Sequence, residues 1–292
     1  MNKKLKLFQR KYPRFIYKKY FWRISKNNLE IFFNFDIEPG IHFCPKVVIE
    51  SINKPRIKKI EEKTLNNLIF HLGLIEMLSY WKATSSSEIK IEAGFLNSEQ
   101  IRWWQDLILN GLGQFFYENK ISFQKPRFFC PIGREQFSAE FYQKEVENRV
   151  LVPISGGKDS LATLEILKKA EKDIRCFSLN PTKVAKKIMK IAKCKKPIIV
   201  RREIDKNLLE LNQRGFLNGH TPFSAYLAFL SVLLAILFDY KNIAFSNEKS
   251  ANEGNLKYLG RMINHQYSKS SEFEEKFREY SKKYLAKNIN YF

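Results

Sequence analysis

The residues best suited to chemistry form a short glycine-containing segment at 155–160. A continuous apolar run precedes it and a helical pattern follows it, so we expect a turn between a buried strand and a helix. Glycines let the backbone approach an anion closely, and the free N–H groups and dipole of a helix start favour negative charge. The segment also contains a lysine, two serine hydroxyls and an aspartate that can hold Mg²⁺. Together these groups predict a phosphate site. In order, its residues are Ser155, Gly156, Gly157, Lys158, Asp159 and Ser160.

This spacing is neither that of a Walker A loop nor that of a dinucleotide fingerprint. A glycine turn without a ligand is the alternative interpretation. The strand before the segment and the helix after it favour the phosphate site, because ligands of open parallel sheets bind beyond the carboxyl ends of the strands.

Strand and helix alternate through the second half of the chain, which predicts a three-layer α/β domain with a parallel sheet and helices on both faces. The predicted strands are 150–154, 174–179, 197–201 and 242–246, and the predicted helices are 160–171, 182–193 and 221–238. Polar stretches lie at 211–222, before the last helix, and at 246–255 and 260–270, after the last strand.

The first part of the chain has a different pattern, which predicts a smaller α+β domain. Strand-like runs occupy 14–24, 29–37, 41–49 and 89–93, helical spacing occupies 60–80, and Asn97-Ser98 can cap a second helix. Trp103 and Trp104 are adjacent, so we expect one in the core and one half-exposed. The irregular stretch 125–143 places the domain boundary at residue 140, which separates a domain at 1–140 from a domain at 141–292 that contains the phosphate segment.

The composition excludes a disordered chain, because 44% of its residues are hydrophobic and 25 are Phe. The net charge of +21 would attract polyanions, and the first 26 residues hold ten Lys and Arg and no acid. A basic arm for nucleic acid is one interpretation. Aromatic residues alternate with these charges, which favours a half-exposed strand with solvated lysines instead.

The four cysteines show no metal-ligand spacing, so the sequence indicates neither a zinc site nor a disulfide framework. The basic N-terminus lacks the apolar run of a signal peptide. The most apolar stretch, 223–238, is shorter than the roughly 20 residues that span a bilayer. We therefore expect a protein without a membrane span, located in the cytoplasm.

The segment at 155–160 resembles the PP-loop of the ATP pyrophosphatases, which implies an adenine nucleotide alpha hydrolase-like fold and transfer of AMP to an acceptor oxygen. Together with the polar stretches at 211–222, 246–255 and 260–270, it is similar to the family of UDP-N-acetyl-α-D-muramoyl-L-alanyl-L-glutamate epimerases. The similarity is strong over residues 145–292 and loose over the first third of the chain.

The resemblance implies an ATP- and Mg²⁺-dependent inversion of the terminal glutamate of UDP-MurNAc-L-Ala-L-Glu in peptidoglycan precursor synthesis. An acyl-adenylate would form, and AMP and pyrophosphate would be released. Family members continue past the position of Tyr291-Phe292 into a region with a cysteine-rich motif that has no counterpart here. We therefore expect a missing C-terminal segment or a second chain as a partner.

Within this family, we assign candidate roles to polar residues near the predicted strand ends. Glu248 is the predicted second Mg²⁺ ligand beside Asp159. His220 and His265 are candidates for α-proton transfer, with structural histidines as the alternative. The candidate substrate-binding residues are Arg214, Asn218, Asn247, Ser250, Asn252, Glu253, Asn255, Arg261 and Lys269.

Two other functions remain open. A PP-loop enzyme that adenylates tRNA would suit the positive charge, although the chain lacks the Cys-x-x-Cys pairs of many thiolating members. A nucleotide-binding or RNA-binding module without catalysis is the other.

Overall fold

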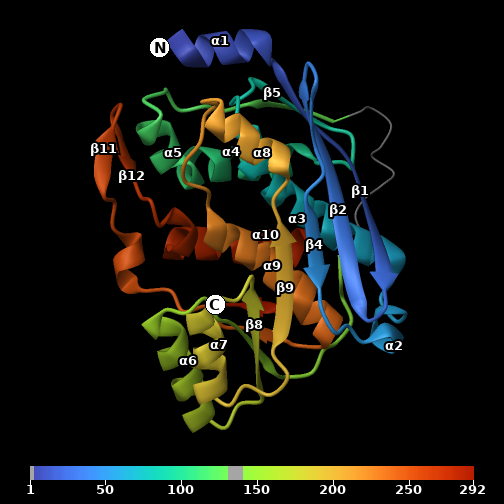
Figure 1. Cartoon of the computed structure of the whole chain (residues 1–292). Coiled ribbons are helices and arrows are strands. Elements are labelled where there is room, and N and C mark those ends of the chain that lie inside the picture. The colour runs from blue at the N-terminus through green and yellow to red at the C-terminus, as the bar shows by residue number, and fades with distance from the viewer. Residues whose placement is uncertain (1–2, 131–140) are drawn as a thin grey trace.

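The computed structural model describes residues 3–130 and 141–292. Figure 1 shows helices packed around a long, twisted sheet. Its first strands are β1 (Arg14–Ser25), β2 (Asn28–Glu38), β3 (Ile41–Phe43), β4 (Lys46–Ile49), β5 (Glu88–Ile91) and β6 (Arg127–Phe129). The later strands are β7 (Val150–Pro153), β8 (Ile174–Leu179), β9 (Ile198–Glu203), β10 (Asn242–Ile243) and β13 (Asn290–Tyr291), and β11 (Leu256–Tyr258) and β12 (Arg261–Ile263) form a separate hairpin.

Helices α1 (Lys3–Lys11), α2 (Lys54–Ile57), α3 (Glu62–Trp81), α4 (Ser98–Gly111) and α5 (Gly113–Glu118) belong to the first part of the chain. The later helices are α6 (Lys158–Lys169), α7 (Lys183–Ile191), α8 (Lys206–Gln213), α9 (Phe223–Phe238) and α10 (Ser271–Tyr284), with short 3-10 turns η1 (Lys249–Asn252) and η2 (Tyr267–Lys269). Each helix of the described residues is too short or too polar to cross a membrane.

The α/β class is confirmed, with helices on both faces of the parallel part of the sheet. Strands β13, β10, β7, β8 and β9 run parallel to one another. Along β7, Leu151 packs into the large core that contains α9, whereas Val150 and Val152 pack against Leu164 of α6 and Met189 of α7. This alternation places the two sets of helices on opposite faces.

The sheet continues from the first part of the chain into the second. Strand β4 pairs antiparallel with β9, so the order across the sheet is β13-β10-β7-β8-β9-β4-β2-β1-β5-β6, with β3 beside β2. The large core likewise contains α3 and α9, which pack against each other. The predicted boundary at residue 140 adjoins residues outside the described ranges, and the division into domains 1–140 and 141–292 stays a prediction.

A buried ion pair connects α3 to β9 inside this shared core. The Glu76 side chain is fully buried, and its two carboxylate oxygens accept hydrogen bonds from Arg202 Nε at 2.7 Å and Nη2 at 2.9 Å. Arg202 also donates to Ser79 Oγ at 2.8 Å, and its guanidinium lies 4.9 Å from the centre of the Tyr226 ring. Both charges are therefore satisfied by a bidentate contact between distant parts of the sequence.

Several predicted elements are confirmed near their expected bounds, and the differences have local causes. Asn97 caps α4 in a reciprocal capping box with Gln100. The run 41–49 is two strands, β3 and β4, because Pro45 between them lacks the N–H that a continuous ladder needs. The first residues are not strand: α1 precedes β1 and packs through Leu5, and the Phe8 ring stacks on Phe216 at 5.0 Å.

The expectation that the cysteines are not paired is wrong for two of them. Cys176 on β8 and Cys194 after α7 form a disulfide, with Cα atoms 6.1 Å apart. Their separation of 18 residues fits no short sequence motif. The fold brings them together because α7 returns antiparallel to β8 and ends beside the strand's start.

A buried histidine forms the centre of a polar network between α3, α4 and α10. The His71 ring donates from Nδ1 to the Asn67 carbonyl at 2.9 Å, and Nε2 lies 3.0 Å from the Tyr280 hydroxyl. That hydroxyl accepts from Trp104 Nε1 at 3.0 Å and so donates to the histidine. Trp104 is the core member of the tryptophan pair and Trp103 is half-buried, as expected. Burial lowers the pKa of His71 to about 4.

The neutral state of His71 predicts acid sensitivity of the fold. An unfolded histidine binds a proton near its ordinary pKa of 6.5, whereas folded His71 does so only near 4. The neutral ring therefore makes its full contribution to stability above pH 6.5. As the pH falls toward 4 this contribution is lost, and the free energy of unfolding decreases by up to about 3 kcal/mol. Urea unfolding across this range should show a steeper pH slope than in His71→Gln. An imidazole resonance of His71 that titrates near pH 6.5 in NMR spectra would contradict this.

Candidate functional site

The predicted phosphate segment lies where β7 meets α6. Gly156 has φ of +111°, a conformation that favours glycine, and Gly157 is the N-cap of α6. Glycine at the N-cap has no side chain that could accept a hydrogen bond from these amides, and an added Cβ on Gly157 would meet nothing within 4 Å. The amides of the helix start are therefore open to a ligand rather than sealed in the core.

The rest of the segment is arranged around this opening. Ser155 and Lys158 are exposed, and Asp159 is half-buried in the first turn of the helix. Ser160 is 4% exposed and its hydroxyl donates to the Gly157 carbonyl at 2.8 Å. Ser160 therefore fixes the turn, while the exposed side chains remain available to a ligand.

A pocket of about 730 Å³, including solvent at its mouth, adjoins the segment. Ser155, Gly157, Asp159 and Ser160 line one side of it. The other sides come from distant parts of the sequence: Phe177, Ser178 and Leu179 from β8, Phe223, Ser224 and Leu227 from α9, and Phe245, Ser246, Asn247 and Lys269 after β10. The pocket therefore combines polar groups at the helix start with apolar walls, which is the kind of lining that small-molecule sites have.

Two of the predicted substrate-binding residues, Asn247 and Lys269, lie in this pocket. Lys269 is exposed at the end of η2, and among the described residues its side chain has no hydrogen bond or ion pair. An anion in the pocket would therefore meet a free cation opposite the helix start. The sequence did not indicate Ser178, Ser224 or Phe245 as pocket residues, because nothing in their local pattern separates them from core positions.

Other predicted residues line a second pocket of about 900 Å³ on the far side of η2. Arg261 and Asn252 line it together with Asn110, Tyr267 and Ser270. Asn252 Oδ1 accepts from the Ser271 amide at 2.8 Å, which holds η1 against the start of α10. Four of the nine predicted substrate-binding residues therefore line the two pockets, with Asn247 and Lys269 in the first and Asn252 and Arg261 in the second.

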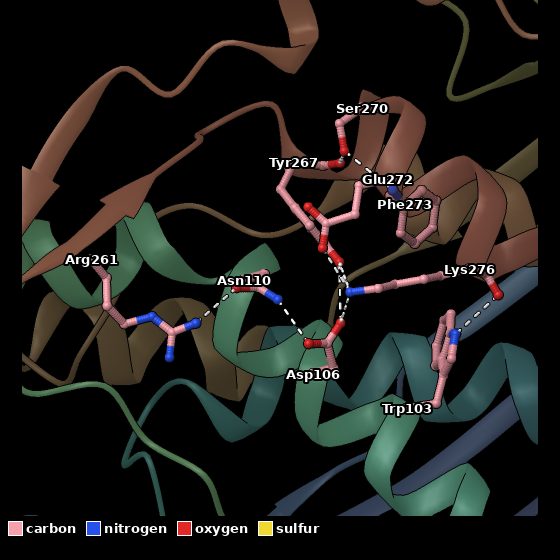
Figure 2. Close-up of polar contacts among 9 residues, drawn as sticks. All are labelled: Trp103, Asp106, Asn110, Arg261, Tyr267, Ser270, Glu272, Phe273 and Lys276. Atoms are coloured by element: carbon pink, nitrogen blue, oxygen red, sulfur yellow. Dashed lines mark hydrogen bonds and ion pairs between the residues drawn. The ribbon is translucent and has the colours of Figure 1, made fainter.

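Figure 2 shows a polar cluster that ties α4 to η2 and α10, and its residues Tyr267 and Glu272 also line the second pocket. Lys276 Nζ lies 2.8 Å from Asp106 Oδ2 and 2.7 Å from Glu272 Oε1, and the Tyr267 hydroxyl donates to Asp106 at 3.2 Å. Burial alone would lower the pKa of Lys276, but its hydrogen bonds to the two carboxylates raise it. Lys276 therefore stays charged and holds η2, with Lys269 at its end, in place.

Asn110 extends this cluster to the predicted substrate-binding residue Arg261. Its amide donates to Asp106 Oδ1 at 2.9 Å, and its carbonyl oxygen accepts from Arg261 Nη2 at 3.2 Å. The Arg261 guanidinium also lies 5.3 Å from the centre of the Phe123 ring. Arg261 is thus oriented at the pocket by two residues of the first part of the chain, which no local sequence pattern could reveal.

The candidate proton-transfer residues lie in neither pocket lining. His220 is half-buried and His265 is exposed after β12, where its amide donates to Asn255 Oδ1 at 2.9 Å. Burial, and then the positive charge of Lys82, lower the pKa of His220, and His265 lowers it further. The lowered pKa favours the neutral ring of His220.

Lys82 fixes the backbone around His220 and was not predicted from the sequence. The residue is 5% exposed, and its ammonium donates to the carbonyl oxygens of Gly219 and His220 and to Thr221 Oγ1, the last two at 3.2 and 2.6 Å. Burial lowers the pKa of Lys82 to about 8. This lysine at the end of α3 holds the 219–221 stretch through all three of its donors.

The remaining predicted residues are exposed and line neither pocket. Arg214 lies over the Phe216 ring at 5.8 Å, and the Asn218 carbonyl accepts from Asn119 at 2.7 Å. Glu248 is exposed and accepts from Ser250 Oγ at 3.3 Å, and Glu253 and Asn255 are also exposed. Within residues 3–130 and 141–292, no group of three or more His, Cys, Asp or Glu residues could hold a metal ion. The pairing of Asp159 with Glu248 around Mg²⁺ stays a prediction.

Comparisons with known proteins agree on one family. The family model described as MurL N-terminal domain matches residues 7–292. The UDP-N-acetyl-alpha-D-muramoyl-L-alanyl-L-glutamate epimerase of Xanthomonas oryzae pv. oryzae is 32% identical over 76% of this chain and 48% of its own length. The proteins of the same name from a Micromonospora species and Salinispora tropica are 31% and 32% identical, each over 72% of this chain and 46% of their own length.

The chain spans about half the length of these curated relatives. No solved structure matches it. The family match covers both the phosphate segment and the first part of the chain, where the sequence resemblance was loose. The chain belongs to the MurL N-terminal domain family.

Proposed function

We propose that the protein takes part in the ATP-dependent epimerisation of the terminal L-glutamate of UDP-MurNAc-L-Ala-L-Glu, a step of peptidoglycan precursor synthesis. The observation that carries the proposal is the open helix start at Gly157, which faces a pocket lined by Asp159 and Lys269. The names of the relatives supply the substrate class. The chain spans about half the length of those relatives, and a further segment or a second chain as partner is part of the proposal.

The residues around the opening suit a nucleoside triphosphate. The amides of the α6 start and the hydroxyl of Ser155 are donors for phosphate oxygens, and Lys269 adds a positive charge. The apolar walls from α9 and the residue after β10, Leu227 and Phe245, suit the adenine ring. Asp159 would hold Mg²⁺, which neutralises phosphate charge and favours departure of pyrophosphate.

The chemistry follows from the acidity of the α-carbon. A glutamate carboxylate oxygen attacks the α-phosphorus of ATP, the bond to the bridging oxygen breaks, and pyrophosphate leaves with that electron pair. The product is an acyl-adenylate. Its carbonyl group carries no charge and can delocalise the α-carbanion as an enolate, whereas a carboxylate would place a second negative charge beside the first. One group removes the α-proton, another delivers a different proton to the opposite face, and hydrolysis by water then gives the D-glutamyl product and AMP.

His220 and His265 are our candidates for the two proton transfers. A two-base inversion needs an acceptor on one face of the α-carbon and a donor on the other. The lowered pKa of His220 keeps its ring neutral, as an acceptor must be. Arg261, held by Asn110 at the second pocket, would bind a carboxylate or diphosphate of the muramyl dipeptide.

Solvent exchange tests this function directly. The protein is incubated with ATP, Mg²⁺ and UDP-MurNAc-L-Ala-L-Glu in deuterated water. A second polypeptide, which corresponds to the part of the curated relatives that this chain does not cover, is added to the mixture. We expect deuterium at the glutamyl α-carbon together with AMP. AMP formation that depends on tRNA and not on the dipeptide would support tRNA adenylation instead, and ATP binding without AMP under any of these conditions would indicate a binding module.

Replacing Gly157 by Ala distinguishes an effect on ATP binding from an effect on the stability of the fold. The added Cβ meets no protein atom and the backbone conformation suits alanine, so we expect a loss of stability below about 1 kcal/mol. The methyl group projects into the space that a phosphate would occupy, so ATP affinity should fall at least about tenfold. Calorimetric titration with ATP, alongside thermal unfolding, measures both effects. Unchanged ATP affinity would show that the nucleotide does not approach this amide.

A further inference from the structure

The ends of α6 and α7 form a basic pole at the opposite end of the strands from the phosphate segment. Both helices begin near the carboxyl ends of β7 and β8, and both end beside the start of β8, at the bottom of Figure 1. The disulfide between Cys176 and Cys194 ties the chain after α7 to this strand. We call the surface made by residues 166–176 and 191–196 the basic pole.

A hollow of about 1130 Å³, open to solvent, lies at the centre of the basic pole. Among its lining residues, six are Lys or Arg and one is acidic. The cations are Lys168, Lys172, Arg175, Lys193, Lys195 and Lys196, and the acid is Asp173. The cationic side chains therefore converge on a concavity rather than being spread over a convex face.

At least three of these six cationic side chains have no partner in the part of the chain that the structure describes. Among the described residues, the side chains of Lys172, Lys193 and Lys195 form no hydrogen bond or ion pair, whereas Lys168 lies 2.9 Å from Glu165. Arg175 donates to the Lys196 carbonyl at 2.8 Å, which braces the wall of the hollow. Lysines in the last turns of α6 and α7 are expected from the helix dipole, but Lys193 and Lys195 lie beyond the helix and have no such role.

Two large aliphatic side chains stand beside the lysines. Ile166 in the last turn of α6 is 67% exposed, and Ile191 at the end of α7 is 60% exposed. Nucleic-acid surfaces combine cations with aromatic stacking and planar guanidinium contacts. Here the cations are mainly lysines, and the exposed apolar groups are isoleucines, a combination that suits the interface of an anionic bilayer.

We propose that the basic pole docks this protein on the surface of an anionic lipid bilayer. The lysines contact lipid phosphates at the hollow, and Ile166 and Ile191 enter the boundary between headgroups and acyl chains. The phosphate segment lies at the other end of the parallel strands, so a docked protein keeps that pocket open to water. This inference is independent of the epimerase proposal, because none of its residues lines either pocket of the candidate site.

Vesicle flotation of the full chain tests the docking. We expect binding to vesicles of phosphatidylcholine mixed with phosphatidylglycerol, and no binding to phosphatidylcholine alone. The triple variant Lys172→Glu, Lys193→Glu, Lys195→Glu should bind at least about 100-fold more weakly. A matched triple variant on α1, Lys3→Glu, Lys6→Glu, Arg10→Glu, makes the same charge change at exposed positions and should bind like the unmodified chain.

The isoleucines are tested separately with Ile166→Gln, Ile191→Gln, which leaves the charge unchanged. We expect weaker vesicle binding at high salt, where electrostatic attraction is screened and insertion dominates. Equal losses in the two triple variants would overturn the proposal, since net charge alone would then explain binding. Binding of inorganic phosphate or of RNA at the basic pole without vesicle binding would also overturn it.

Discussion

Replacing Asp159 by Asn is expected to reduce AMP formation at least about 100-fold while the fold remains intact. Asp159 lies in the first turn of α6 and lines the pocket beside Gly157. Asparagine has nearly the same shape but lacks the negative charge that holds Mg²⁺ against phosphate oxygens. Pyrophosphate release, measured with the complementing polypeptide present, is the readout.

Glu165→Gln is the matched control, because it removes a carboxylate from the exposed side of the same helix. Glu165 pairs with Lys168 at 2.9 Å, away from the pocket lining. We expect this variant to keep full activity. If Asp159→Asn turns over at the normal rate, and the affinity for Mg²⁺ is also unchanged, the metal role assigned to this carboxylate is wrong.

Breaking the buried ion pair is expected to cost more stability than any surface substitution. Glu76→Ala should lower the free energy of unfolding by about 3–5 kcal/mol, because Arg202 would be left charged and buried without its partner. Urea unfolding monitored by fluorescence provides the measurement. Glu165→Ala, which breaks an exposed pair on α6, should cost less than about 1 kcal/mol.

A double-mutant cycle tests whether the loss arises from the pair itself. Removing both charges with Glu76→Ala and Arg202→Ala should cost less than the sum of the two single losses, since no unpaired charge remains. Additive losses would mean that each side chain stabilises the fold through packing alone. The cycle therefore distinguishes an electrostatic connection between α3 and β9 from a simple loss of contacts.

The sequence predicted best those features that short stretches of chain determine. The strand expected from the apolar run before the glycines, the helix cap at Asn97 and the buried helix α9 all have local causes, and each is found in the structure. Two helices in polar stretches were missed although signals were present. In α10, Phe273, Phe277 and Tyr280 recur at helical spacing after the capping Ser270, and in α8, Asp205 caps a helix with Leu208 and Leu211 buried.

Contacts between distant parts of the chain could not be predicted. Lys82 reaches the backbone at Gly219, Asp106 pairs with Lys276, and Cys176 bonds to Cys194, yet each partner looks like an ordinary surface or core residue in its own stretch. The candidate site also depends in part on contacts between distant parts of the chain. Its glycine segment is local, whereas Lys269 and Asn247 enter the pocket only through the three-dimensional arrangement of β10 and η2.

The pairing of β4 with β9 also bears on how the chain acquires its fold during synthesis. Strand β4 is complete at residue 49, but its second neighbour, β9, is not complete until the ribosome has added residue 203. Until then, one edge of the nascent sheet has unpaired backbone groups, which are prone to pair with other chains. Such late, long-range closure predicts slow folding with a high relative contact order, and a need for chaperones that shield the waiting edge.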